Sequence, residues 1–180
     1  MIKKMSQEQT DNLPVAVNAV AEDLLARLGI PGTVFCRDHR KDDSPHLWVE
    51  IVTEHSGLLI GERGANLRAL EHVLRLLLRD ILPNDCRCLV DVNTYRLRRM
   101  EFLKKMSRDA ARRAVSSQHA ITLEPMNAME RRIVHMALVE ETGVETTSVG
   151  IDPARRVIIR PRDPMLAGAG VYREGVENRV

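Results

Sequence analysis

Aromatic residues are scarce in this chain of 180 residues, where they make up 3% of the sequence. The five are Phe35, Trp48, Tyr95, Phe102 and Tyr172. Stacking of bases on aromatic side chains is one standard route to binding single-stranded nucleic acids. The scarcity excludes a broad aromatic surface, so any nucleic acid would have to be held mainly by other contacts.

Cysteine is also rare, with only Cys36, Cys86 and Cys88 in the chain. An odd number of cysteines without a secretory signal argues against a disulfide framework. The Cys86-x-Cys88 pair lacks the spacing and the second pair of ligands that a zinc site needs. We therefore expect small reduced residues in the core or at its edge, and predict neither a metal nor a cofactor.

Long apolar runs are missing as well, and none of them is long enough to cross a bilayer. The first twelve residues contain two lysines without an apolar segment behind them, so they do not read as a signal peptide. Hydrophobic and charged contents of 44% and 29% are typical of a globular protein with a core. The sequence therefore predicts a cytoplasmic protein without membrane insertion.

The distribution of charge separates two parts of the chain. Residues 11–92 carry nine Lys or Arg against thirteen Asp or Glu, a net charge of −4. Residues 93–163 carry fourteen against nine, a net charge of +5. A polyanion is expected to be drawn mainly to the second part. The shift in composition also predicts a domain boundary near Asn93.

The first part alternates between helical and extended patterns. We expect a helix over 17–28, strands over 33–37, 47–52 and 87–92, and a charged loop over 38–46. A helix–loop–helix unit lies between the second and third strands. Three strands with helices on one face make a small α+β domain.

Two glycines enclose two charged residues in the loop Gly61-Glu62-Arg63-Gly64. A strongly apolar helix follows, with one predicted face formed by Leu67, Leu70, Val73, Leu74, Leu77, Leu78 and Ile81. Glycines let a backbone turn tightly and let another backbone approach closely. The arrangement resembles the GXXG loop of a KH domain, which clamps about four nucleotides. A plain turn between two helices is the alternative interpretation.

A long helix is predicted from Asn93, as its cap, to about Ser117. Four of its basic residues fall along one face: Arg98, Lys105, Arg108 and Arg112. Each one alone is best interpreted as part of a solvated helix face. Together, beside a nucleic-acid site, they would contact phosphates.

A second helix begins at Asn127, which forms a predicted capping box with Glu130. Arg131 and His135 are four residues apart and share one face of this helix, whereas Arg132 points toward solvent. A short strand at 121–123 precedes the helix. Strands at 146–151 and 156–160 follow it and are joined as a hairpin.

The stretch from Leu123 to His135, LEPMNAMERRIVH, resembles the core of an R-three-H domain. A KH domain followed by an R-three-H domain resembles the Jag family (SpoIIIJ-associated) of bacterial RNA-binding proteins. The resemblance implies a KH domain at 13–92, a three-stranded sheet with helices, and an R-three-H domain at 93–162, helices on a small sheet. The ends, 1–12 and 163–180, are expected to be flexible.

The chain departs from the family pattern at two residues. Glu62 stands where family loops commonly carry a basic residue, which weakens the expected phosphate contact of the KH loop. Met129 stands where family members often carry an aromatic residue. Many relatives also have an additional N-terminal Jag domain, which we expect to be absent because about a dozen residues precede the first helix.

The resemblance implies a binding site for single-stranded RNA, or single-stranded DNA, held mainly through phosphates. The expected contact residues are Ile60, Gly61, Glu62, Arg63, Gly64, Leu67, Arg98, Arg108, Arg131, Arg132 and His135. Ile60 and Leu67 would line a groove for bases or belong to the core. His135 would donate to phosphate, stack on a base, or anchor its helix to the sheet.

The implied role is post-transcriptional regulation linked to cell envelope growth and division. The first rival is an enzyme with His135 as general base, although no nucleophile motif or metal-ligand spacing accompanies it. The second is an adaptor that works through protein contacts, with a small KH-only protein as partner. A continuous basic strip through Arg98, Arg108, Arg131 and Arg132 would favour nucleic acid, and a large exposed apolar patch would favour a protein partner.

Overall fold

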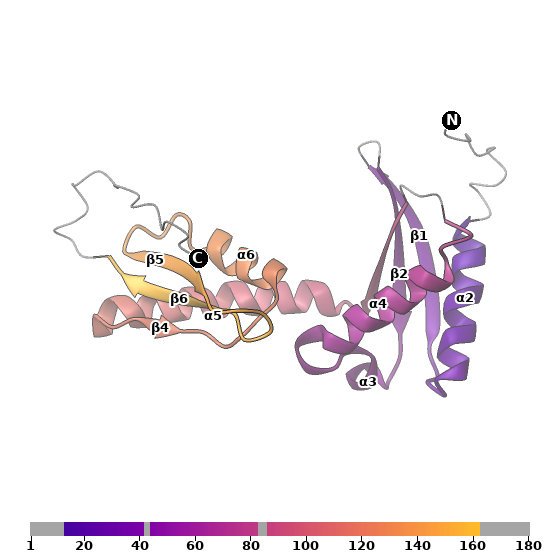
Figure 1. Ribbon diagram of the computed structural model, residues 1–180, viewed down its shortest axis with the longest axis horizontal. Coiled ribbons are helices and arrows are strands. Elements are labelled where there is room, and N and C mark those ends of the chain that lie inside the picture. The colour runs from indigo at the N-terminus through magenta and orange to yellow at the C-terminus, as the bar shows by residue number, and fades with distance from the viewer. Residues whose placement is uncertain (1–12, 42–43, 83–85, 163–180) are drawn as a thin grey trace, which may run out of the picture. The chain divides into compact units, whose positions relative to one another are not determined.

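The computed structural model describes residues 13–41, 44–82 and 86–162 (Figure 1). The chain divides into two compact units, Met1–Arg98, here called the N-terminal unit, and Arg99–Val180, the C-terminal unit. Each contains helices and a three-stranded sheet, so the predicted α+β class with two small domains is confirmed. The predicted flexible ends fall outside the described residues.

The N-terminal unit has an α-β-β-α-α-β order. Its elements are α2 (Leu13–Arg27), β1 (Thr33–Lys41), β2 (Ser44–Val52), α3 (Ser56–Ile60), a short 3₁₀ helix (Glu62–Gly64), α4 (Ala65–Leu77) and β3 (Arg87–Val92). The sheet order is β1-β2-β3, with β1 and β2 antiparallel and β2 and β3 parallel. A parallel pair needs a crossover connection, and α3 and α4 supply it.

The core of this unit lies between the sheet and the helices α2 and α4, which also contact each other (Figure 1). Alternate residues of β2, Leu47, Val49 and Ile51, are buried. Helix α2 contributes residues at helical spacing and α4 contributes leucines. These buried helical residues are Leu13, Val17, Ala21, Leu25, Leu67, Leu70 and Leu74.

The predicted charged loop at 38–46 is wrong. β1 continues to Lys41 and β2 already begins at Ser44, with Lys41 paired opposite Ser44. An antiparallel pair is held by backbone hydrogen bonds, which charged residues make as well as apolar ones do. The charged residues therefore gave no indication in the sequence that the strands of this hairpin continue to Lys41 and from Ser44.

The predicted apolar face of α4 is only partly buried. Leu67, Leu70, Leu74 and Leu78 lie in the core, whereas Val73, Leu77 and Ile81 are exposed. The apolar arc is wider than the strip that one sheet covers. An exposed apolar stripe, Val73, Leu76 and Leu77, therefore runs along α4.

The C-terminal unit takes most of α5 (Tyr95–Ser117). It continues with β4 (Ile121–Thr122), α6 (Ala128–Ala137), β5 (Val144–Val149) and β6 (Arg156–Pro161). The sheet order is β4-β6-β5, antiparallel throughout. The predicted hairpin is confirmed, although its first strand begins two residues earlier than predicted because Val144 is buried in the core.

The core of the C-terminal unit combines small residues of α5 with larger ones of the sheet and α6. Ala110 and Ala114 of α5 are fully buried, which lets other elements pack closely against this helix. Val134 of α6 and Val157 and Ile159 of β6 complete the centre of the core. None of the described helices is long and apolar enough to cross a membrane.

Candidate nucleic-acid interface

The loop Gly61–Gly64 has a backbone that requires glycine at both ends. Gly61 and Gly64 have φ angles of 66° and 77°, in the left-handed region. A Cβ at Gly61 would overlap the side-chain amide of Asn66, and one at Gly64 would lie 3.1 Å from a ring carbon of Tyr95. The loop therefore has a specific backbone shape.

Hydrogen bonds from both flanks hold this loop. The Gly61 amide donates to the Gly57 carbonyl at 2.9 Å. Asn66 donates from Nδ2 to the Leu58 carbonyl at 2.8 Å, and Arg68 donates to the Arg63 carbonyl at 3.2 Å. These bonds connect α3 to α4 across the loop, so its shape is set before any ligand arrives.

The predicted contact residues of the loop lie in different environments. The Glu62 side chain is 84% exposed and Arg63 is more covered, with 3.9 Å between Arg63 Nε and Glu62 Oε1. Ile60 is half-buried and packs against the core, and Leu67 is part of the core. Glu62 therefore faces solvent, Arg63 is partly covered, and Leu67 is buried.

The start of α5 differs from the prediction. Asn93 has a φ angle of 48° and does not cap the helix. Its side chain accepts from the Thr53 amide and donates to the Thr53 carbonyl, at 3.1 and 2.8 Å. The buried carboxylate of Asp91 accepts instead from the Arg96 amide at 3.1 Å. Burial raises the pKa of Asp91 above its ordinary value, against the opposing effect of its amide hydrogen bonds.

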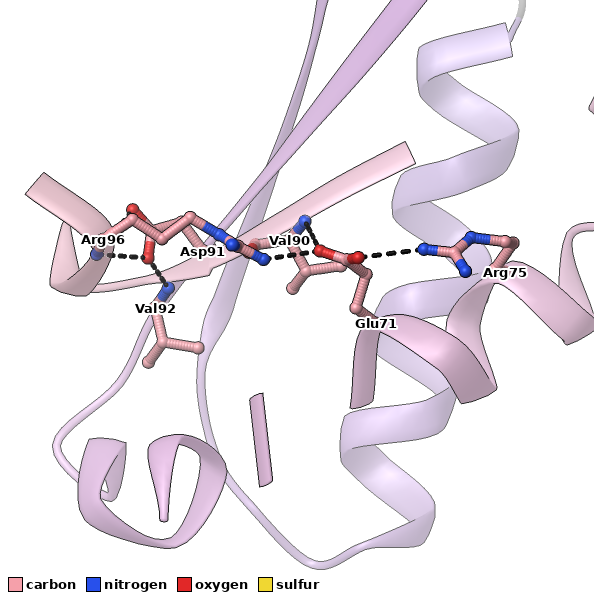
Figure 2. A network of polar contacts seen from close by, with 6 residues as sticks. All are labelled: Glu71, Arg75, Val90, Asp91, Val92 and Arg96. Carbon is pink, nitrogen blue, oxygen red and sulfur yellow. Dashed lines mark hydrogen bonds and ion pairs between the residues drawn. The ribbon is translucent and has the colours of Figure 1, made fainter. Parts of the chain in front are cut away.

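Glu71 of α4 forms ion pairs with two arginines (Figure 2). Its carboxylate pairs with Arg96 and with Arg75, and it accepts from the Val90 amide at 3.3 Å. Arg96 also donates to the Val90 carbonyl at 2.8 Å. Arg96 therefore ties α5 to β3 and α4, and part of its charge is compensated inside the N-terminal unit. The sequence pattern did not reveal this pairing.

The capping box of α6 is confirmed. Asn127 Oδ1 accepts from the Glu130 amide at 3.0 Å, and Glu130 Oε2 accepts from the Asn127 amide at 3.2 Å. The other oxygen of Glu130 accepts from Arg99 Nε at 2.7 Å. The Glu130 side chain is only 8% exposed, so this carboxylate joins α5 to the first turn of α6 inside the C-terminal unit.

Arg131 lies in the interior, although its predicted role was a contact at the surface. Its side chain is 7% exposed, and Nη1 donates to the Met126 carbonyl at 2.8 Å and to Asp152 Oδ1 at 2.9 Å. Asp152 follows β5, so Arg131 fastens the β5–β6 turn to α6. It does not take part in the basic surface strip that the sequence suggested.

His135 contacts the same hairpin one turn further along α6. Its Nδ1 lies 2.7 Å from Thr146 Oγ1 on β5. Burial lowers the pKa of His135 below its ordinary value, and the nearby Arg131 cation adds to the effect. His135 is therefore neutral at neutral pH. Arg131 and His135 do share a helix face, and that face meets β5 and the turn after it.

The remaining predicted cations are exposed: Arg98, Arg108 and Arg132. Arg98 donates to the Asn93 carbonyl at 2.8 Å, within the N-terminal unit. Arg108 and Arg132 lie on the surface of α5 and α6 in the C-terminal unit. These two retain the position in solvent that a phosphate contact requires.

A groove of about 610 Å³ lies on the N-terminal sheet, and sequence reasoning missed it. It is lined by four apolar or aromatic residues and four polar ones: Phe35, Trp48, Val52, Leu97, Arg37, Glu50, Asp91 and Thr94. Glu50 accepts from the Thr94 amide at 2.9 Å and from Trp48 Nε1 at 3.4 Å. The alternation along β1 and β2 contained the signal, because Phe35 and Trp48 occupy the positions between buried residues.

The cysteines and other potential ligands form no metal centre in the described residues, where no group of three His, Cys, Asp or Glu side chains is suitably placed. Cys36 and Cys86 are half-buried and Cys88 is buried, and no disulfide joins these three residues. Burial raises the pKa of Cys36 to about 11 and that of Cys88 to about 12. Both thiols therefore stay protonated near neutral pH.

Comparison with protein families matches residues 101–161 to the R-three-H domain. This part of the chain is similar to the R-three-H domain. It contains Arg131 and His135, together with β4, β5 and β6. The N-terminal unit lies outside the match, and its assignment as a KH domain is a proposal based on its element order and its glycine loop.

Curated relatives named "RNA-binding protein KhpB" resemble the chain over a longer stretch. The protein of Clostridium symbiosum is 36% identical over 111 residues, 62% of this chain and 50% of the relative. Those of Bacillus subtilis and Lactiplantibacillus plantarum are 34% and 32% identical over 61% of this chain, and over 53% and 34% of their own lengths. The resemblance to the Jag family is confirmed, and the chain spans about a third to a half of each of these relatives.

Proposed function

We propose that this protein binds single-stranded RNA as a post-transcriptional regulator in the cytoplasm. The observation that carries the proposal is the R-three-H domain at 101–161, located in the part of the chain with a net charge of +5. The names of the relatives support RNA as the ligand. A link to cell envelope growth and division remains part of the same proposal.

In the N-terminal unit, the glycine loop acts as a clamp through its shape. Its left-handed glycines let a sugar-phosphate backbone come close to the loop amides, as in a KH domain. Arg63 adds one cation beside this backbone. Glu62, which is almost fully exposed, places a negative charge at the same position and weakens binding.

In the C-terminal unit, exposed cations bind phosphates, and buried cations position the elements that carry the exposed ones. Arg131 is bound to Asp152 and Met126, so we assign it a positioning role for α6 and the β5–β6 turn. The adjacent Arg132 and Arg108 of α5 are exposed and act as the phosphate contacts. Neutral His135, held by Thr146, contributes hydrogen bonding or stacking without adding charge.

A fluorescence anisotropy titration of the full chain tests this function. The probe is an unstructured RNA of about twelve nucleotides, longer than the about four that a KH loop clamps. Affinity is expected to fall steeply between about 50 and 200 mM salt as counterions return to the phosphates. Binding that does not change with salt would exclude a contact led by phosphates.

Glu62→Lys tests whether the glycine loop takes part. The variant should bind the same RNA more tightly, because it replaces a repulsive charge with an attractive one at an exposed position. Glu54→Lys is the matched control, since Glu54 is exposed in the same unit but lies outside the loop. Equal gains in the two variants would show a general charge effect and remove the clamp from the proposal.

We propose binding without catalysis. His135 contacts a threonine hydroxyl, where a general base oriented for catalysis would commonly contact a carboxylate. Labelled RNA should therefore stay intact during incubation with the protein, with or without magnesium or manganese. Cleavage that is lost in His135→Ala would overturn this assignment.

An adaptor role is the second candidate, favoured by the apolar stripe Val73, Leu76 and Leu77 on α4. Exposed apolar patches of this kind commonly mark protein contacts. A small KH-only protein is the proposed partner. Leu76→Lys should abolish such a contact while leaving RNA affinity unchanged, and pull-down with the purified partner measures it.

A further inference from the structure

Phe102 is a large apolar side chain that the fold leaves in solvent. It lies on α5, inside the R-three-H domain, and is 56% exposed. The guanidinium carbon of Arg99 lies over its ring, 5.5 Å from the centroid. One face of the ring is therefore associated with a cation, while more than half of the residue stays open to solvent.

The cation beside this ring is held in place. Arg99 donates from Nε to Glu130 at 2.7 Å, and the Arg99 side chain is only 21% exposed. Glu130 is fixed in turn by the capping box of α6. The ring thus stands beside a guanidinium that buried contacts hold before any ligand binds, which lowers the ordering cost of binding.

The charges near Phe102 favour an anionic ligand. Lys105, one turn further along α5, is exposed, and Arg108 follows it. Glu101 is paired with Lys104 at 3.4 Å. The other strongly exposed aromatic residue among those described, Phe35, instead shares its groove with two carboxylates, Glu50 and Asp91, and one cation, Arg37. Of these two phenylalanines, only Phe102 has surroundings that suit a phosphate chain.

We propose that Phe102 is a stacking platform for an unpaired base of the RNA bound by the R-three-H domain. Arg99 positions the ring, and Lys105 contacts a phosphate beside the stacked base. The inference rests on the proposed RNA binding and adds base contacts to a site otherwise explained by phosphates. An apolar partner protein is disfavoured here because Arg99 lies over the ring and Lys105 is exposed one turn away.

Phe102→Leu in the full chain removes the ring and retains an apolar side chain. Its dissociation constant for the RNA of about twelve nucleotides should rise about fivefold or more, as expected for one lost stacking contact. The slope of log Kd against log salt should not change, because no cation is lost. Phe102→Trp should retain or increase affinity, and Phe35→Leu is the matched control and should bind as the wild type does.

An oligonucleotide of the same length that carries abasic sites separates bases from phosphates. Phe102→Leu and wild type should bind this probe equally. An equal loss on both probes would show that the ring does not contact a base, and would overturn the proposal. If wild type binds RNA and Phe102→Leu binds it equally well, only this inference fails; if wild type binds no RNA, the proposed function fails with it. Melting temperatures measured alongside should agree, since Phe102 is largely exposed.

Discussion

The two units differ in how their functional residues are placed. In the N-terminal unit the candidate site is a backbone shape, in which left-handed glycines are held by hydrogen bonds from Asn66 and the Gly61 amide. In the C-terminal unit it is a set of side chains, and two cations there, Arg99 and Arg131, are paired with the carboxylates of Glu130 and Asp152. The comparison shows that a glycine motif predicts the local backbone, whereas a count of charged residues does not predict which charges are exposed.

The charge count is the clearest case. Residues 93–163 have a net charge of +5, but the fold uses several of their cations internally. Arg96 pairs with Glu71, Arg99 with Glu130, and Arg131 with Asp152. The positive charge available to a polyanion is therefore concentrated in fewer, exposed residues, such as Arg108 and Arg132.

The largest expected effect tests the buried contacts of the C-terminal unit. Glu130→Ala removes the partner of Arg99 and half of the capping box, and should lower the free energy of unfolding by about 2–4 kcal/mol. Denaturant unfolding measures it. Glu145→Ala, at an exposed position of β5, is the control and should change stability by less than about 0.5 kcal/mol. A small effect of Glu130→Ala would mean that this network is dispensable.

The backbone of the N-terminal unit gives the next effect. Gly61→Asp forces a side chain into a left-handed position that overlaps Asn66, and should cost about 1–3 kcal/mol of stability. Gly57→Ala is the matched control, because a Cβ there meets nothing within 4 Å. Thermal melts in which both variants match wild type would refute the built shape of the loop.

The neighbouring arginines of α6 separate binding from positioning. Arg132→Ala should weaken RNA binding by about 1–3 kcal/mol and flatten the salt slope by about one unit. Arg131→Met should mainly lower the melting temperature, because the Met126 carbonyl and Asp152 lose their donor. Anisotropy and melting curves on both variants measure the difference. Reversed results would restore Arg131 as the direct contact.

The smallest effect concerns pH. The folded state holds the pKa of His135 below its ordinary value of 6.5, so the unfolded chain binds a proton more readily. The stabilisation from neutral His135 is present above pH 6.5. It is lost as the pH falls from 6.5 toward the pKa of His135 in the folded state. Wild type should therefore lose more melting temperature between neutral pH and about pH 5 than His135→Gln does. Equal losses would show that His135 is not coupled to folding.

Cutting the chain into halves is a poor way to compare the two units. Helix α5 runs without interruption from Tyr95 to Ser117, across the division between Arg98 and Arg99. A cut near Asn93 would separate Arg96 from Glu71, and would remove the two bonds between Asn93 and Thr53. Single substitutions in the full chain avoid this damage.

Local sequence patterns determined much of this protein by themselves. The inward alternation of Leu47, Val49 and Ile51, the glycines of the loop and the capping box of Asn127 and Glu130 were all predictable. In each case the physical cause lies within a few neighbouring residues: a strand period, a left-handed φ angle, or a side chain that reaches a backbone amide.

Only the tertiary structure decided which charged and apolar residues remain exposed and able to contact a ligand or partner. Asp91 instead of Asn93 caps α5, Arg131 is buried against Asp152, and Val73 and Leu77 are exposed although their neighbours are buried. Burial and ion pairing depend on which residues of another helix or strand lie opposite, and those residues are distant in the sequence. Phe102 shows the same dependence, because its value as a stacking group comes from Arg99 and, through it, from Glu130 on a different helix.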